Sequence, residues 1–389
     1  MSKPRKLAVV TTSRADFGLL HWLIFGAAAD PAFRLQLVVS GSHLSDAFGR
    51  TEALIRAEGL RPAARVDIAA RGGTDLDTAR SLGLGVTRFA EALSKLKPDL
   101  MVVLGDRFEI LAAASAAAAL RIPIAHLHGG EASEGVIDEQ IRHAVTKLSY
   151  LHFTAAEPYR RRVLQLGEAP ARVFNVGAPG LEYIARMEPL PEQELERRVG
   201  MSLASPTLLA TFHPEGGSRT MASLSALLSA LSDADLPTVF TFANADAGGN
   251  AVNAAIQRFC KGKERCRAVP SLGQDGYLSL MARAAAVVGN SSSGLLEAPS
   301  LRVPTVNIGD RQAGRLRAPS VIDAPASRTA IRRAIRQALL PSFRRLRCMG
   351  ANPYGGGRVS ERILAVLKRF PLPAGVVRKT FYDWHGGRP

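Results

Sequence analysis

The chain of 389 residues has few cysteines, few aromatic residues and no long apolar run. Its three cysteines, Cys260, Cys266 and Cys348, show neither the spacing of a metal site nor a disulfide framework. No apolar run approaches the roughly 18 residues of a membrane span, and the apolar stretch Leu7–Thr12 is too short for a signal-peptide core. We therefore expect a cytoplasmic protein with no membrane partner.

Acidic residues are also scarce. The chain has 34 Asp and Glu against 50 Lys and Arg, a net charge of +16 and an isoelectric point of 10.4. Such a charge is a cue for nucleic-acid binding. However, the arginines are spread along the chain, with denser clusters at Arg160–Arg162, Arg328–Arg336 and Arg344–Arg347, and no aromatic residues interleave with them. Because helix-turn-helix, zinc and RNP patterns are also missing, we expect no nucleic-acid partner and keep a basic nucleic-acid-binding protein as the least favoured alternative.

Strands and helices are expected to alternate along most of the chain, because short apolar runs end in polar loops that lead into helical patterns. The length and the 47% of hydrophobic residues support more than one core. The sequence predicts an α/β protein with two Rossmann-like domains facing a cleft, in the style of GT-B proteins. The expected parts are an N-terminal domain over residues 1–184, a nucleotide-binding domain over residues 185–357, and a C-terminal helix and tail over residues 358–389. Strands are expected at residues 6–12, 33–40, 65–68, 100–104, 122–126, 150–154, 173–176, 207–212, 238–243, 267–269, 285–288 and 303–308.

The first predicted strand runs into the loop S-R-A-D-F-G, which opens a helix. Free backbone N–H groups and the helix dipole make such a loop a natural anion site. The loop has no G-x-G-x-x-G sequence, so the dinucleotide fingerprint is missing. The segment is compatible with two roles for Arg14. One is pairing with a phosphate, and the other is that of an ordinary surface arginine.

The densest set of chemically capable side chains lies in one predicted β-α-β unit over residues 99–147. Asp106 and Arg107 follow its first strand, and H-G-G-E, from His128 to Glu131, follows its second strand. Ligands of open α/β sheets bind outside the carboxyl ends of the strands. A single Asp-Arg pair in this place is usually a helix cap with a surface ion pair. Three acids, several histidines and a Gly-Gly pair within one unit favour a functional site instead.

A second constellation is expected in the second domain, where the loop G-N-S-S-S-G follows a strand and opens a helix. Small hydroxyl residues, here Ser291 and Ser292, let the backbone approach a phosphate, and the helix N-terminus adds N–H donors. Serine-rich loops also serve as caps or linkers, but these flanks fit a phosphate cradle. About one helical turn later, Glu297 is placed to accept two ribose hydroxyls. With Arg311, His213 and the loop N-A-D-A-G-G at other strand ends, the pattern indicates nucleotide-sugar chemistry.

A set of short motifs, spread in order over residues 5–370, carries a resemblance to a known family. The motifs are G-D-R-F-E, H-L-H-G-G-E, D-E-Q-I-R-H-A-V-T-K, F-H-P, N-A-D-A-G, G-N-S-S-S-G-L-L-E-A-P, V-P-T-V-N-I-G-D-R-Q-A-G-R and N-P-Y-G-G-G. Together they resemble the hydrolysing UDP-N-acetylglucosamine 2-epimerases of bacterial sialic-acid and legionaminic-acid pathways. Each motif is weak alone, but the ordered set is specific. The resemblance implies a GT-B-like fold whose C-terminal helix packs back on the first domain.

The resemblance also implies roles for individual residues. Catalytic acids or bases are implied at Asp106, Asp138 and His128, and a histidine near the leaving diphosphate at His213. Several members that act on UDP-N-acetylglucosamine carry Glu at the position of His128, and Glu131 and Glu139 are nearby acids that could share its role. Contacts with the nucleotide and the rest of the substrate are implied for Arg14, Arg107, Asn244, Asp246, Ser291, Ser292, Glu297 and Arg311.

The function implied by the resemblance is hydrolysing 2-epimerisation of a nucleotide sugar. UDP-N-acetylglucosamine, or its 4-acetamido-4,6-dideoxy analogue, would give UDP and the free 2-epimer of N-acetylmannosamine type, which feeds nonulosonic-acid synthesis. No metal and no cofactor are implied, the partner is the nucleotide-sugar substrate, and a homodimer or homotetramer is expected. The sequence leaves open which hexosamine is used and whether the nucleotide is UDP or GDP. The alternatives are a GDP-N-acetylglucosamine 2-epimerase and a GT-B glycosyltransferase, which would need an acceptor site.

Overall fold

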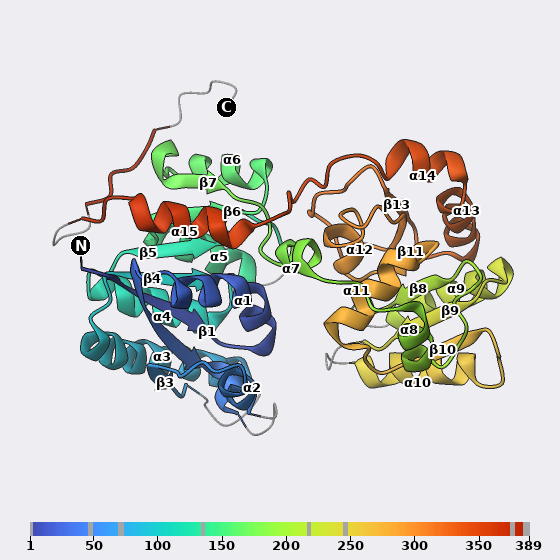
Figure 1. Ribbon diagram of the computed structural model, residues 1–389, viewed down its shortest axis with the longest axis horizontal. Helices are drawn as coiled ribbons and strands as arrows, with labels where there is room; N and C mark the ends of the chain where they lie inside the picture. Colours follow the sequence, from blue (N-terminus) through green and yellow to red (C-terminus); the bar gives the residue numbers. More distant parts are fainter. Residues whose placement is uncertain are drawn as a thin grey trace. The chain divides into compact units, whose positions relative to one another are not determined.

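The computed structural model describes residues 3–45, 50–68, 74–133, 137–215, 219–243, 248–373 and 378–383. The chain forms two compact units, shown as ribbons in Figure 1. The N-terminal unit comprises Met1–Glu182 together with Gly355–Pro389, and the C-terminal unit comprises Tyr183–Tyr354. Each unit is built on its own parallel sheet. The α/β class with two parallel sheets, predicted from the sequence, is therefore confirmed.

The N-terminal unit contains a seven-stranded parallel sheet in the order β3-β2-β1-β4-β5-β6-β7. Its central strand β4 is buried along its whole length, which explains why its sequence, L-M-V-V-L, is entirely apolar. The register pairs Met101 with Ile124 and Leu104 with Leu127, so β4 and β5 end side by side. The strands are β1 (Arg5–Thr11), β2 (Phe33–Ser40), β3 (Ala64–Val66), β4 (Leu100–Leu104), β5 (Ile124–Leu127), β6 (Leu151–Thr154) and β7 (Val173–Asn175).

Helices cover both faces of this sheet. One face is buried by α1, α2 and α15, and the other by α3, α4 and α5. Helix α15 follows the C-terminal unit in sequence but packs on the N-terminal sheet. Its residues Val359, Ile363 and Leu367 are buried in the same layer as α1 and α2. The helices are α1 (Arg14–Ala29), η1 (Gly41–Leu44), α2 (Glu52–Ala57), α3 (Asp75–Leu96), α4 (Phe108–Ala119), α5 (Ile137–Leu148), α6 (Glu157–Gln165), η3 (Pro170–Arg172) and α15 (Val359–Arg369). Helix α7 (Leu181–Arg186) contains the sequence boundary between the two units.

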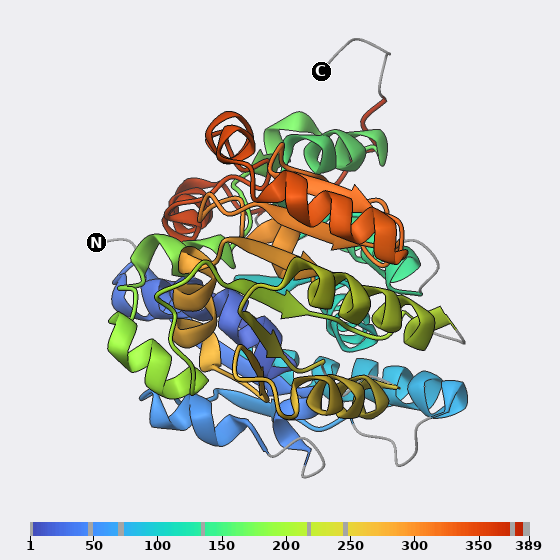
Figure 2. The same ribbon diagram turned by 90° about the vertical axis from the view of Figure 1, so that its right-hand side faces the viewer.

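The C-terminal unit contains a six-stranded parallel sheet in the order β10-β9-β8-β11-β12-β13. Helices α9, α10 and α13 bury one face, as Figure 2 shows, while α8 and α11 bury the other. Its strands are β8 (Leu208–Thr211), β9 (Thr238–Thr241), β10 (Cys266–Val269), β11 (Ala286–Gly289), β12 (Thr305–Ile308) and β13 (Val321–Ala324). Its helices are α8 (Glu192–Val199), α9 (Arg219–Ala234), α10 (Gly249–Cys260), α11 (Gly273–Arg283), α12 (Ser293–Leu296), α13 (Arg328–Ala338) and α14 (Pro341–Arg347).

The arrangement of the strands decides where chemistry can occur. Within each sheet all strand pairs are parallel, so their carboxyl ends share one edge, where ligands of such sheets bind. The loops after β1, β4 and β5 meet at that edge of the N-terminal unit, and the loops after β8, β11 and β12 meet at the corresponding edge of the C-terminal unit. In the part of the chain that the structure describes, no helix is both long and apolar enough to cross a membrane.

Candidate active site

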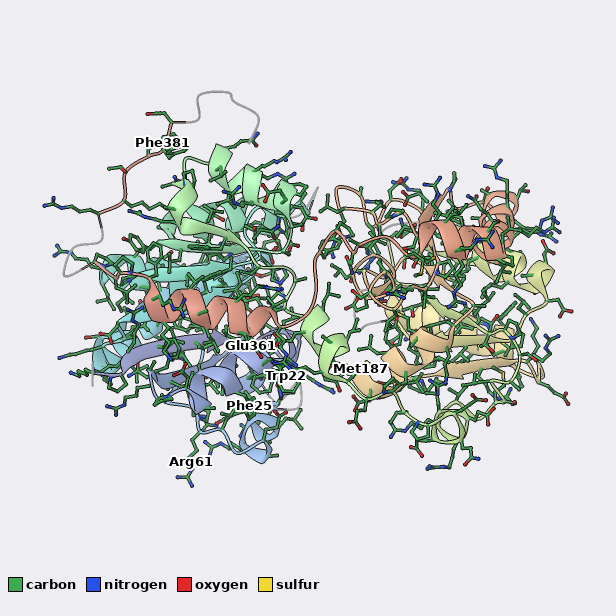
Figure 3. All side chains as sticks on the ribbon, turned by 45° about the horizontal axis from the view of Figure 1, so that its top comes forward. Trp22, Phe25, Arg61, Met187, Glu361 and Phe381 are labelled. Atoms are coloured by element: carbon green, nitrogen blue, oxygen red, sulfur yellow. The ribbon has the colours of Figure 1, made fainter. Side chains whose placement is uncertain are left out.

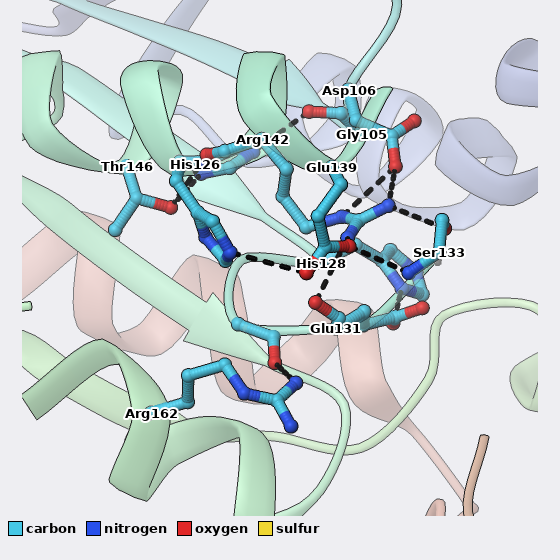
Figure 4. A network of polar contacts seen from close by, with 12 residues as sticks. Gly105, Asp106, His126, His128, Glu131, Ser133, Glu139, Arg142, Thr146 and Arg162 are labelled. Carbon is cyan, nitrogen blue, oxygen red and sulfur yellow. Dashed lines mark hydrogen bonds and ion pairs between the residues drawn. The ribbon is translucent and has the colours of Figure 1, made fainter. Parts of the chain in front are cut away.

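Arg142, on helix α5, organises the polar cluster of the N-terminal unit (Figure 4). Its side chain is only 2% exposed, and all five of its N–H donors are used. Nε donates to Oδ2 of Asp106 at 2.9 Å, and one Nη2 donor goes to the same oxygen. The others reach Oε2 of Glu139 at 2.6 Å, the Glu131 carbonyl at 2.8 Å and Oγ of Ser133 at 2.7 Å. One buried guanidinium therefore joins the loops after β4 and β5 to the first turns of α5.

Asp106 follows β4 and the turn at Gly105. The alternative role as a cap of the next helix is wrong, because Arg107 is the N-cap residue of α4 and no side chain caps that end. Asp106 turns instead to the buried guanidinium of Arg142, and both contacts go to Oδ2. Its other oxygen, Oδ1, has no hydrogen bond from the described residues, which leaves it available to a substrate.

Asp138, in the first turn of α5, lies in a different environment. Burial and the nearby charge of Asp106 raise its pKa, and the cations Arg107 and Arg142 only partly offset this. Two carboxyl groups with unlike surroundings, one bound by an arginine and one whose pKa is raised by burial, are typical of an acid/base pair. Arg107 is half-exposed and forms two hydrogen bonds with the buried carboxylate of Glu109, which raises the pKa of Arg107 and keeps its charge at this edge.

His128 follows β5 with a backbone φ of 67°, a left-handed conformation that is uncommon for a residue with a side chain. Such strain clusters at functional sites. Its Nδ1 is hydrogen-bonded to Glu131, three residues later, which fixes the orientation of the ring. His126, inside β5, is fully buried, and its Nε2 donates to the Gly105 carbonyl at 2.8 Å. Burial lowers the pKa of His126 to about 3, so that ring is neutral and supports the loop that carries Asp106.

The loop after β1 is held by one buried carboxylate. Asp16 accepts hydrogen bonds from the hydroxyl of Thr11, from the backbone N–H and hydroxyl of Thr12, and from the backbone N–H and hydroxyl of Ser13, at 2.7 to 3.0 Å. Ser13 is the N-cap of α1, so the loop and the helix start form one rigid unit. Arg14, the first residue of α1, is exposed.

In the C-terminal unit, Asn290 joins the ends of β8 and β11. Its fully buried amide accepts from the backbone N–H of His213 at 2.7 Å and donates to the His213 carbonyl at 2.8 Å. The Asn290 carbonyl in turn accepts from Nε2 of Gln312 at 2.9 Å and from Nη1 of Arg311 at 3.2 Å. These bonds bring His213 and Arg311, both predicted as site residues, to the same edge of the sheet.

The serine loop comes next in the chain. Gly289 has a φ of 144°, and a Cβ there would lie 1.9 Å from the Thr211 carbonyl oxygen, so only glycine fits. Ser291 and Ser292 precede the short helix α12, and Oγ of Ser293 bonds both Ser291 at 3.0 Å and the hydroxyl of Tyr277 at 2.6 Å. The loop therefore presents hydroxyls and helix-start N–H groups together, as a phosphate cradle requires.

Glu297 is the C-cap residue of α12. Its Oε2 is inaccessible to solvent and has no hydrogen-bond partner among the described residues. Burial raises the pKa of Glu297 to about 7, and a backbone hydrogen bond and the charge of Arg315 offset this only in part. A buried carboxylate oxygen that lacks a donor is costly, which favours a ligand that supplies hydroxyl groups there.

Asn244 and Asp246, two predicted site residues, lie outside the described residues.

Sequence reasoning missed several residues that the structure brings into these clusters. Arg142 was recognisable from its spacing of three and four residues after Glu139 and Asp138, which puts the three side chains on one helix face. Asp16 was recognisable as the third residue of a capping box after Ser13. Asn290 and Tyr277 had no sequence signal, because their roles depend on which loops the sheet brings together.

Comparisons with known proteins identify the family of the chain. A family model described as UDP-N-acetylglucosamine 2-epimerase matches residues 27–368. A Campylobacter jejuni protein named GDP/UDP-N,N'-diacetylbacillosamine 2-epimerase (hydrolyzing) is 39% identical over 83% of this chain and 85% of its own. Polysialic acid biosynthesis protein P7 of Escherichia coli is 36% identical over 97% of each chain. UDP-N,N'-diacetylbacillosamine 2-epimerase (hydrolyzing) of Legionella pneumophila is 33% identical over 96% of this chain and 98% of its own.

Solved structures show the same fold. The UDP-GlcNAc 2-epimerase of Neisseria meningitidis bound to UDP-GlcNAc has a TM-score of 0.73 at 16% identity, covering 93% of this chain and 99% of that one. The enzyme of Methanocaldococcus jannaschii in complex with UDP-GlcNAc and UDP has a TM-score of 0.74 at 20% identity, with the same coverage. The fold and the family match thus define a nucleotide-sugar enzyme of the GT-B-like class. The chain belongs to the hydrolysing UDP-N-acetylglucosamine 2-epimerase family, and its activity is the hydrolysing 2-epimerisation of a nucleotide sugar.

Proposed function

We propose that the substrate is UDP-N,N'-diacetylbacillosamine, the 4-acetamido-4,6-dideoxy analogue of UDP-N-acetylglucosamine. The observation that carries this choice is the name of two relatives, 39% and 33% identical over most of the chain, which are both diacetylbacillosamine 2-epimerases. The products are then UDP and the free 2-epimer, a precursor of legionaminic-type nonulosonic acids. We further propose that the enzyme is a cytoplasmic homo-oligomer.

The first chemical step is elimination. The C2 proton of a hexosamine is not acidic, so its removal needs a positioned base. In our proposal Oδ1 of Asp106 takes this proton, because Arg142 binds only Oδ2 of that carboxylate. The electron pair of the C2–H bond forms a C1=C2 double bond, and the C1–O bond breaks toward the diphosphate. This leaves UDP and a glycal.

The second step is hydration of the glycal. A proton is added to C2 from the opposite face, and the oxygen of water bonds to C1 while its proton passes to a base. Asp138 is assigned the protonation of C2, because burial and the charge of Asp106 raise its pKa above that of an ordinary aspartate. His128, oriented by Glu131, is suited to accept the proton of the attacking water.

The nucleotide is assigned to the C-terminal unit. The serine loop with Ser291 and Ser292 faces the diphosphate through N–H and hydroxyl donors, and Arg311 and His213 offset the charge that develops on it. Glu297 accepts the ribose hydroxyls through its carboxylate, since the residue as a whole is only partly buried. Arg14 and Arg107, at the edge of the N-terminal sheet, are further groups that can pair with negative charge of the substrate.

The decisive experiment incubates the purified protein in deuterated water with UDP-N,N'-diacetylbacillosamine, its GDP counterpart and UDP-N-acetylglucosamine, and follows the products by NMR. We expect fastest turnover of the first substrate and deuterium at C2 of the released sugar. The GDP sugar is included because the Campylobacter jejuni relative is named as a GDP/UDP-N,N'-diacetylbacillosamine 2-epimerase. Preference for UDP-N-acetylglucosamine would contradict the proposed sugar, and a product with hydrogen at C2 would contradict proton abstraction.

A further inference from the structure

A short segment over residues 378–383, here called the C-terminal strap, lies against the N-terminal unit at the end of helix α5. The backbone N–H of Tyr382 donates to the Gly167 carbonyl at 2.9 Å. The ring of Phe381, labelled in Figure 3, rests on Gly167, where a Cβ would lie 2.3 Å from it. The ammonium of Lys147, in the last turn of α5, lies 4.9 Å from the centre of the same ring. The strap thus contacts both the helix end and the turn after α6.

Lys379 makes the deepest contact of the C-terminal strap. Its Nζ donates to the carbonyls of Lys147 and Ser149, both at 2.7 Å, and lies 3.5 Å from the carbonyl of Thr146. The last carbonyls of a helix have no partner inside the helix, and a cation there also offsets the negative end of the helix dipole. The side chain of Lys379 is 16% exposed, so the cap is largely shielded from water.

The cap is anchored by a buried carboxylate. Oε2 of Glu168 lies 2.7 Å from the ammonium of Lys379, and its two oxygens also bind Lys147 at 2.7 Å and His152 at 2.9 Å. Burial alone would raise the pKa of Glu168, but the hydrogen bonds from His152 and the two lysines outweigh it and bring the pKa to about 2. Glu168 is therefore a charged anchor at the C-terminal end of α5.

The opposite end of the same helix carries the proposed chemistry. Asp138 and Glu139 lie in the first turn of α5, about 15 Å from its last residue at the usual rise per residue, and Arg142 lies about 9 Å from that residue. Arg142 must keep its position to reach Asp106, because all five of its donors are committed. Helix α5 is capped by Lys379 at its C-terminal end and hydrogen-bonded through Arg142 in its first turns. Its three charged side chains therefore have little conformational freedom.

We propose that Lys379 is a positioning residue, which caps α5 and so holds Asp138 and Arg142 in register with Asp106. The proposal rests on the proposed function for the identity of these catalytic groups. It assigns to the C-terminal strap a part in turnover that requires no contact with the substrate. It predicts a specific kinetic signature, in which the chemical step slows and nucleotide binding does not change.

The test compares Lys379→Met with Lys368→Met in the full chain. Lys368 is the matched control, because it lies on α15, away from α5. Its exposed ammonium pairs with Asp30 at 3.0 Å. In Lys379→Met, Glu168 keeps Lys147 and His152 as partners, which favours a folded variant. We expect kcat to fall roughly 10- to 100-fold, as a small displacement of catalytic groups produces, while KM and the dissociation constant for UDP stay within about twofold of wild type. Lys368→Met should match wild type.

Two further variants keep the test decisive. Lys379→Arg retains the charge and should recover part of the lost kcat. Phe381→Ala removes the ring that packs on Gly167 and Lys147 while leaving Lys379 and Glu168 unchanged, and it should lower kcat in the same direction. Unchanged kcat in both Lys379→Met and Phe381→Ala, at unchanged melting temperature, would overturn the proposal, as would equal losses in Lys379→Met and Lys368→Met.

Amide hydrogen exchange separates this proposal from the proposed function. The amides of residues 141–148 should exchange faster in Lys379→Met than in wild type or Lys368→Met, whichever substrate the enzyme uses. If the wild-type protein processes no nucleotide sugar, the proposed function fails. The exchange result still tests whether Lys379 stabilises the C-terminal end of α5. Equal exchange in all three proteins would overturn the role of Lys379.

Discussion

Arg142 shows how one side chain can determine the geometry of a site. An arginine that is 2% exposed is costly unless each donor is used, and here each one is. Its partners come from the loop after β4, the loop after β5 and helix α5. The position of Asp106 is therefore set by Arg142 rather than by its own strand alone.

Asp106→Asn is expected to lower kcat by about 10²- to 10⁴-fold, because an amide cannot accept the C2 proton. It should also lower the free energy of unfolding by roughly 1–3 kcal/mol, since the hydrogen bond to the charged Arg142 is weakened. Turnover and urea unfolding should be measured on the same preparation. Asp30→Asn, which alters a surface ion pair, is the control. Full turnover in Asp106→Asn would move the base to His128, Glu131 or Asp138.

Glu297→Gln is expected to weaken UDP binding roughly 10- to 100-fold, the effect of losing a hydrogen bond to a charged group of about 1.5–3 kcal/mol. The pKa of Glu297, raised to about 7, adds a pH signature. Hydroxyl donors prefer the ionised carboxylate, so UDP affinity in wild type should rise as pH increases from 6 to 8. Calorimetric titration should show a smaller rise in Glu297→Gln, whereas the exposed control Glu264→Gln should follow wild type. Equal pH profiles in wild type and Glu297→Gln would remove Glu297 from the site.

Sequence reasoning succeeded for residues whose chemistry is local and failed for those defined by partners. Asp106, His128 and Glu297 follow strands or a serine loop, so their place at a sheet edge could be predicted from the alternation of elements. The N-cap role of Asp106 was a fair local alternative, but only the fold shows that Arg142, 36 residues later, takes that carboxylate instead. Asn290 was unpredictable for the same reason, because its partner His213 is 77 residues away.

At the scale of elements, the period of apolar residues located most strands and helices to within a few residues. Fully buried runs such as β4 have no competing interpretation. Strand β13, Val321–Ala324, was missed because it is a short, half-exposed edge strand whose sequence V-I-D-A contains an acid. Helix α13 was visible only as a cluster of arginines, although Ile331 and Ile335 bury its inner face.

Strand β5 carries a destabilising group that acts below neutral pH. His126 is neutral in the folded protein because burial lowers its pKa to about 3, whereas the unfolded chain takes up a proton near 6.5. Between these values the unfolded state binds more protons, so stability falls as pH falls from about 6.5 toward 3. At pH 5 this group alone should cost roughly 2 kcal/mol relative to pH 7.5.

Urea unfolding at pH 7.5 and pH 5.0 tests this expectation. The loss of stability between the two pH values should be smaller in His126→Gln than in wild type, even though His126→Gln is less stable at both. His21→Gln, at a partly exposed histidine of α1, should keep the wild-type difference. An identical pH-dependent loss in His126→Gln and wild type would show that His126 is not the group responsible.

At the scale of the whole molecule, the net charge of +16 becomes useful for a substrate that carries a diphosphate. Long-range attraction raises the association rate of an oppositely charged ligand and is screened by salt. Raising ionic strength from about 0.05 to 0.5 M should therefore lower kcat/KM several-fold. Uridine binding, which involves no phosphate charge, is the control and should change little. A kcat/KM that is independent of salt would show that the basic surface plays no part in substrate capture.

The discontinuous N-terminal unit has a consequence for how the chain is made. Helix α15 fills the apolar layer over α1, yet a ribosome delivers it only after Tyr183–Tyr354 has been synthesised. At about 5–20 residues per second this delay is roughly 10 to 30 s. The C-terminal unit, being continuous in sequence, can complete its core first. During that interval the apolar side chains of α1 that pack with Ile363 and Leu367 in the folded protein stay exposed to water. A nascent chain stalled at this stage would present to chaperones an apolar surface that is buried in the complete enzyme.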